Sequence, residues 1–100
     1  MASSKEYLGF VLGQLGDPER VSYRPMMGEY VIYYDGKVVG GIYDDRFLVK
    51  PTKSAKALLP DAPYEIPYEG AKEMLPADVD DRELLAALLP AIADDLPRKK

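Results

Sequence analysis

The side chains available for chemistry are carboxylates, lysines, arginines, tyrosines and four serines, because the sequence contains no cysteine and no histidine. This excludes disulfides, thiolate nucleophiles, Cys/His zinc sites and Ser-His-Asp triads. The densest acidic cluster offers hard oxygen atoms of the kind that bind Mg²⁺ or Ca²⁺, and it consists of Asp78, Asp80, Asp81 and Glu83. A calcium loop needs a glycine at its sharp turn, and this stretch has none. We therefore interpret the cluster as the capped start of a helix and predict no metal site and no cofactor.

Four cations lie between residues 46 and 56 with no acid among them, although the whole chain carries a formal charge of −4. We call Arg46, Lys50, Lys53 and Lys56 the basic segment. Lys53 and Lys56 are three residues apart, so a helix would place them on one face, and Lys50 directly precedes it. The segment therefore predicts one contiguous patch. In one interpretation the patch is a solvated strand edge that lysines protect from aggregation. In the other it meets an acidic protein surface, because the acidic remainder of the chain opposes attraction to DNA.

Length and composition indicate a single folded domain spanning residues 1–100. Hydrophobic residues make up 47% of the sequence and charged residues 30%, as is usual for a folded domain that dissolves in water. No run approaches the ~18 apolar residues that a transmembrane helix needs. The first residues lack the apolar core of a secretory signal. We therefore expect a cytoplasmic protein with no membrane segment.

Helix signals begin and end the chain. Ser3 and Glu6 have the spacing of a capping box, and Gly16 suits the end of the first helix. The apolar face between them consists of Leu8, Val11, Leu12 and Leu15. A final helix is predicted after Asp80, and Pro90 inside it is expected to kink or split it. Residues 97–100 are expected to form a frayed tail.

The middle of the chain has the pattern of an antiparallel β-meander. A short strand from Val21 is predicted to stop at Pro25, and a second strand follows over 29–34. Asp35-Gly36 is a strong hairpin signal because a type I′ turn needs positive φ at both central residues. Two further strands are predicted over 37–43 and 46–50. Val38, Gly40 and Ile42 are expected to share one face of the sheet.

The predicted elements after the meander are short. They are a helix over 53–59, an irregular loop over 60–70 with Tyr64, Ile66 and Tyr68 as apolar anchors, and a strand near 73–75. The expected fold class is α+β, in which an antiparallel meander sheet and flanking N-terminal and C-terminal helices form two layers.

Several motifs occur together in order: Arg24-Pro25-Met26-Met27-Gly28, Tyr34-Asp35-Gly36-Lys37, Gly40-Gly41-Ile42 and the segment ending at Lys50. In these the chain resembles the TfoX N-terminal domain family over about residues 5–95. That family is the amino-terminal module of the TfoX/Sxy regulators of competence for DNA transformation. The resemblance implies a small α+β domain in a bacterial protein. Full regulators also have a carboxy-terminal helical domain, which we do not expect in these 100 residues.

The resemblance carries over Arg24, Met26, Met27, Gly28, Gly36, Gly40 and Lys50. In one interpretation Arg24, Gly28 and Lys50 belong to a partner-binding surface. In the other, the glycines serve the backbone, the methionines fill the core and the two cations lie on strand edges.

The sequence and the resemblance together predict a non-catalytic domain that acts in transcription regulation by protein–protein contact. The resemblance implies the cyclic-AMP receptor protein or the transcription machinery as the partner. The oligomeric state is left open, with a homodimer as one possibility. One alternative is a module that binds a small ligand or nucleic acid through Arg24 and the basic segment. Another is a carboxylate enzyme with Mg²⁺ at Asp78–Glu83.

Overall fold

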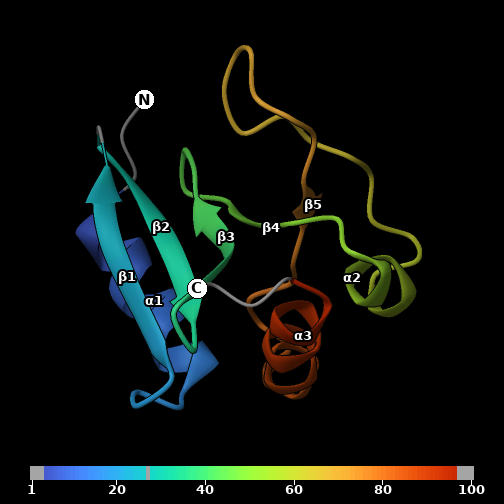
Figure 1. Cartoon of the computed structure of the whole chain (residues 1–100). Coiled ribbons are helices and arrows are strands. Elements are labelled where there is room, and N and C mark those ends of the chain that lie inside the picture. Colours follow the sequence, from blue (N-terminus) through green and yellow to red (C-terminus); the bar gives the residue numbers. More distant parts are fainter. Residues whose placement is uncertain (1–3, 27, 97–100) are drawn as a thin grey trace.

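The structure, a computed structural model, describes residues 4–26 and 28–96 (Figure 1). Met27 and the predicted tail at 97–100 lie outside the described residues. The elements are, in chain order, α1 (Lys5–Leu15), β1 (Val21–Met26), β2 (Glu29–Tyr34), β3 (Lys37–Ile42), β4 (Phe47–Val49), α2 (Lys53–Leu58), β5 (Leu75–Pro76) and α3 (Arg82–Asp95).

The five strands form one antiparallel sheet in the order β1-β2-β3-β4-β5, so the predicted meander and the α+β class are confirmed. Asp35 and Gly36 both have positive φ, 52° and 79°, as the hairpin prediction requires. Asp44 and Asp45 turn the chain between β3 and β4, also with positive φ. Short turns make neighbours of the consecutive strands from β1 to β4, whereas residues 50–74, which include α2, join β4 to β5.

The first strand runs through Pro25 to Met26, so the prediction that Pro25 stops it is wrong. The backbone N–H of Asp35 donates to the carbonyl of Arg20 (2.8 Å). This makes Arg20 and Asp35 a hydrogen-bonded pair and sets the phase in which hydrogen-bonded and non-hydrogen-bonded pairs alternate along β1 and β2. In that phase Pro25, opposite Tyr30, occupies a position whose N–H would point away from β2. Proline therefore loses no sheet hydrogen bond here, and the edge offers one donor fewer to a foreign strand.

A bulge between β2 and β3 changes which valine enters the core. Tyr33 pairs with Val38 while Ile32 pairs with Gly40, so Val39 is the extra residue. Val39 is fully buried in the core, whereas Val38 is only half-buried. The expected common face of Val38, Gly40 and Ile42 is therefore wrong for Val38, because one inserted residue shifts the alternation.

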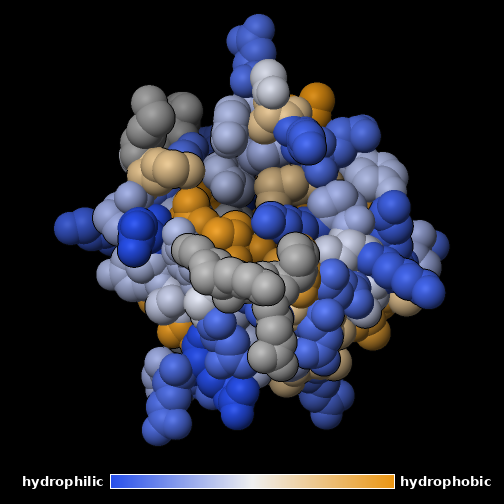
Figure 2. Space-filling view, viewed as in Figure 1, coloured by the Kyte–Doolittle hydropathy of each residue, from blue (hydrophilic) through white to orange (hydrophobic). Residues whose placement is uncertain are grey.

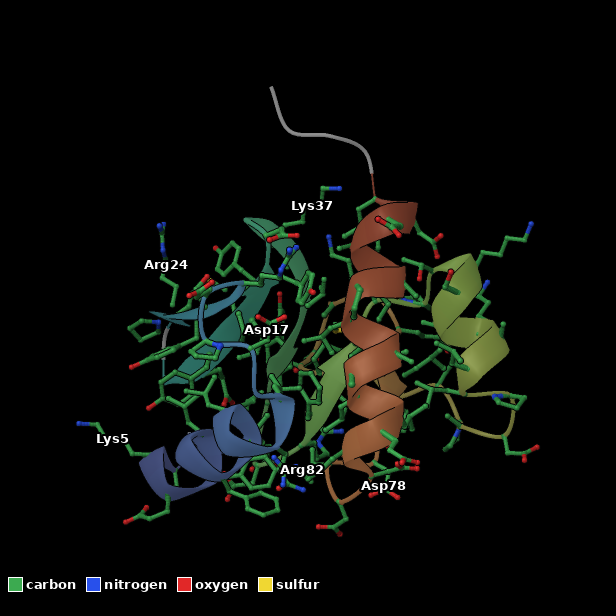
Figure 3. The ribbon with its side chains drawn as sticks, turned by 90° about the horizontal axis from the view of Figure 1, so that it is seen from below. Lys5, Asp17, Arg24, Lys37, Asp78 and Arg82 are labelled. Carbon is green, nitrogen blue, oxygen red and sulfur yellow. The ribbon has the colours of Figure 1, made fainter. Side chains whose placement is uncertain are left out.

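One hydrophobic core joins the sheet to all three helices. Its largest fully buried side chains are Phe47, Ile32, Ile42, Leu85, Leu88, Ile92, Val11, Val39 and Val49. Seen from below, α3 lies between α1 and α2 and contacts both (Figure 3). The helices therefore form the second layer that the sequence predicted.

The long helix α3 is unbroken from Arg82 to Asp95, so the predicted split at Pro90 does not occur. Pro90 cannot donate to the carbonyl of Ala86, but Ala86 is exposed and water can satisfy that oxygen. The Lys37 ammonium also donates to the Ala93 carbonyl in the last turn (2.9 Å; Lys37 is labelled in Figure 3). Leu89 and Ile92, on the two sides of Pro90, are both buried in the core, and this packing holds one helix together.

Side chains cap the helices as local chemistry requires, although not always at the expected residue. Ser4, one position after the expected Ser3, accepts a hydrogen bond from the Tyr7 N–H (3.1 Å) and begins α1. Thr52 accepts from the Ala55 N–H (3.2 Å) and begins α2. In the described part of the chain, no helix is long and apolar enough to cross a membrane.

Candidate functional site

Two of the predicted partner-binding residues lie at the β1 edge of the sheet. Arg24 is exposed on β1, and its guanidinium carbon lies 5.9 Å from the centre of the Tyr33 ring, a cation–π arrangement. Gly28 lies in the turn between β1 and β2 with a φ of 85°. The basic segment includes the residues at the two ends of β4, which lies three strands away from β1, so the structure does not bring Arg24 and Gly28 together with it.

Arg46 holds the long loop that follows α2, residues 59–74, which we call loop 59–74. Its guanidinium forms an ion pair with Glu65 (2.6 Å) and donates to the carbonyls of Tyr43 (3.2 Å) and Pro67 (3.4 Å). Pro67 is buried. The charge of Arg46 is therefore matched within the protein, and this residue is an anchor of the loop.

The other three members of the basic segment remain at the surface. Lys53 and Lys56 are exposed on α2, and Lys50 is half-buried just before it. Asp95 of α3 lies at the start of α2, where it accepts the Ser54 N–H (2.7 Å). This backbone hydrogen bond, above all, lowers the pKa of Asp95, and attraction to Lys53 contributes less. Asp95 therefore offsets part of the positive charge at α2.

A groove of about 660 Å³ lies where the basic segment meets loop 59–74. Val38 and Gly40 of β3 contribute to one side of it, and Lys50 borders it ahead of α2. Most of the remaining wall comes from loop 59–74, including Tyr68 and Lys72. In Figure 1 this loop rises between α2 and β5, and Figure 2 shows hydrophobic residues gathered over β3 among hydrophilic ones.

Two tyrosines give the groove an aromatic border. The rings of Tyr43 and Tyr68 are 5.8 Å apart, centre to centre. Tyr43 is buried above Gly41, where an added Cβ would lie 2.7 Å from the tyrosine ring. Burial raises the pKa of Tyr43, and the nearby Tyr68 and Glu29 add to this. The phenol therefore stays neutral well above physiological pH.

The loop exposes large hydrophobic side chains that were expected to anchor it. Tyr64, Ile66 and Tyr68 are 48%, 53% and 56% exposed, so their expected role as anchors is wrong. Leu58, at the end of α2, is 37% exposed. Alternation at period two was the available signal, but in an irregular loop it does not tell which side faces the protein. Buried Pro67 and the Arg46–Glu65 ion pair secure the loop in their place.

A second concave region lies between α1 and β1. It consists of two adjoining recesses of about 490 and 510 Å³, both of which include Leu12 and Tyr23. Gly9 and Gly13 border it from α1. Its border carries fewer charged groups than that of the first groove, so it offers less chemistry for recognition.

The acidic cluster lies at the start of α3 (Asp78 and Arg82 are labelled in Figure 3). Asp81 accepts the Leu84 N–H (3.0 Å), and Asp78 accepts the Asp80 N–H (3.0 Å). These hydrogen bonds agree with a helix cap, which falls at Asp81 instead of Asp80. Within residues 4–26 and 28–96, no three acidic side chains are grouped as a metal site.

The fold and surface define a small antiparallel α+β domain with its most chemically varied groove between the sheet and one long loop. A family model, the TfoX N-terminal domain, matches residues 13–89, and the chain belongs to this family. The predicted resemblance is thus confirmed.

The chain is also similar to a curated protein of Spirochaeta aurantia, described as an uncharacterized 12.7 kDa protein in the trpE 5′ region. The two are 38% identical over 102 residues, an alignment that covers all of this chain and 89% of the relative. No solved structure gives a significant match.

Proposed function

We propose that this chain is a non-catalytic regulatory domain of the TfoX/Sxy type, connected with competence for DNA transformation, and that it acts in the cytoplasm by binding another protein. Membership of the TfoX N-terminal domain family supports the regulatory role. The contact mechanism is our own inference and rests on the surface of α2 and loop 59–74.

The observation that carries the proposal is a set of exposed hydrophobic side chains at the end of α2 and on the loop that follows it, together with exposed lysines on α2. Leu58, Tyr64, Ile66 and Tyr68 are all more than one-third exposed. Lys53 and Lys56 are exposed on α2. Protein interfaces commonly combine a central group of aromatic and aliphatic side chains with a charged rim. The surface fits a partner that presents an apolar patch with acids around it.

The family points to the cyclic-AMP receptor protein or another part of the transcription machinery as this partner. Arg24 and Gly28 lie at the other edge of the sheet, so they would form a separate contact. The proposed interface therefore centres on Lys53, Lys56 and the loop, with Lys50 at its border. Self-association through the same surface is the competing outcome.

A photo-crosslinking residue placed at Tyr68 tests the proposal, with the same residue at Tyr23 on β1 as the matched control. Both tyrosines are about half exposed, at 56% and 47%. In native cells we expect position 68, and not position 23, to crosslink to the cyclic-AMP receptor protein or a transcription protein. With the purified partner, Lys53→Glu plus Lys56→Glu should weaken binding by about tenfold or more, since charge pairs between proteins contribute strongly.

Crosslinking from position 23 alone would move the interface to the α1–β1 region and contradict this assignment. A crosslinked homodimer from position 68 would replace the partner with a second copy of the chain.

The alternative function, nucleic-acid binding through the basic segment, makes a different prediction. We expect no detectable binding to random duplex DNA at physiological salt, because the basic segment supplies few cations and the whole chain carries a charge of −4. We also expect Lys50→Glu plus Lys53→Glu to change stability by no more than about 1 kcal/mol. Fluorescence anisotropy and urea denaturation measure the two quantities. Micromolar binding with a steep salt dependence, lost in this double variant, would favour the nucleic-acid module.

A further inference from the structure

The groove between β3 and loop 59–74 has the size of a small-molecule site. Its volume of about 660 Å³ falls within the range of ~300–1,000 Å³ typical of ligand pockets. Gly40 borders it through the backbone of β3. Gly70, whose φ of 88° suits glycine, turns the wall formed by the loop. The groove is thus a shaped feature of the backbone as well as of the side chains.

The charges at the groove favour an anion. Lys50 comes from the chain before α2 and Lys72 from loop 59–74, and both border the groove. Among residues 4–26 and 28–96, neither ammonium has a carboxylate within ion-pair distance. Glu73 also borders the groove, so the three charges sum to +1. This balance suits a monoanion better than a polyphosphate or a nucleic acid.

The uncharged part of the groove favours a flat ring. Tyr68 borders it, and its ring lies against that of Tyr43, which is held in place by burial. Val38 and Met74 add aliphatic surface. Aromatic rings stack on tyrosine in offset or tilted geometry and pack well against such side chains. A flat apolar ring joined to one negative group would match both parts of the groove.

We propose that this groove binds a small aromatic or heteroaromatic carboxylate. The ring packs beside Tyr68 and Val38, and the carboxylate pairs with Lys50 and Lys72. This site shares Tyr68 and Lys50 with the protein contact proposed above, whereas Lys53 and Lys56 belong to the protein contact and do not border the groove. A bound ligand would touch both the sheet and loop 59–74.

Amide-resolved NMR titration of the full chain tests the proposal with three probes. Indole-3-carboxylate is flat and anionic, indole-3-carboxamide is flat and neutral, and acetate is anionic without a ring. We expect saturable shifts with indole-3-carboxylate at the amides of residues 40, 50 and 68–74. The other two probes should bind at least about tenfold more weakly, since each lacks either the charge pair or the stacked ring.

Single variants then assign the contacts. Lys72→Gln and Lys50→Gln should each weaken indole-3-carboxylate binding by about tenfold, the effect of losing one charge-assisted hydrogen bond. Lys56→Gln, an equally conservative change on α2, should leave it unchanged. Lys72 is exposed, so its variant should fold normally and keep the test decisive.

Three results would overturn the proposal. The first is a change in amide chemical shift that still rises linearly with indole-3-carboxylate concentration in the millimolar range, which means that no site is being saturated. The second is saturable binding at the α1–β1 recesses. The third is equal affinity for the carboxylate and the carboxamide.

Discussion

Gly40→Ala is expected to lower the free energy of unfolding by about 3 kcal/mol, at the upper end of overpacking effects. A Cβ at position 40 would collide with the carbonyl oxygen of Leu48 and lie 2.9 Å from the Cα of Val49. Both atoms belong to the backbone of the neighbouring strand β4, so no side-chain rotation can relieve the contact. The strands must separate, which would also weaken the pairing of β3 with β4.

Gly13→Ala on α1 is the matched control, and its effect should have the opposite sign. A Cβ there meets nothing within 4 Å. Alanine is favoured over glycine inside a helix by about 0.5–1 kcal/mol, so this variant should be more stable than the parent chain. Urea denaturation followed by circular dichroism measures both changes. Equal effects of the two variants would mean that β3 and β4 do not approach each other as described.

Leu88→Ala should destabilise the protein by about 3–4 kcal/mol through the cavity it leaves. Leu88 is fully buried near the middle of α3, the helix that contacts α1, α2 and the sheet. The loss is a large part of the ~5–15 kcal/mol that usually stabilises a domain. In a domain of this size, each kcal/mol lowers Tm by about 4–8 °C.

The control is Leu58→Ala on α2, where the same atoms are removed from a side chain that is 37% exposed. We expect a loss of about 1 kcal/mol or less. Thermal unfolding of the two variants gives the comparison directly. A similar fall in Tm for both would show that α3 does not carry the central part of the core.

The position of Arg46 explains why the groove depends on the fold. Its guanidinium reaches Glu65, 19 residues away, and the Pro67 carbonyl. These contacts hold loop 59–74 against the protein beside the groove. A residue that the sequence suggested as a partner contact therefore acts within the chain, where it positions Tyr68 and Lys72 indirectly.

The kinds of elements, their order and their turns followed from the sequence itself. Asp35-Gly36 predicted a hairpin because backbone sterics near positive φ are local and do not depend on distant contacts. The apolar spacing of Leu8, Val11 and Leu15 predicted the buried face of α1 for the same reason. The family could also be predicted, because each of its motifs spans only a few residues and needs no knowledge of distant contacts.

Tertiary structure decided the features that depend on residues far apart in sequence. The phase of β1 against β2 made Pro25 acceptable within a strand, and packing on both sides kept α3 whole at Pro90. The bulge sent Val39 to the core instead of Val38. The groove needs Lys50 and Lys72, 22 positions apart in the sequence, to border one space. Local patterns do not determine how a loop closes over a sheet, because that depends on long-range contacts such as Arg46 with Glu65.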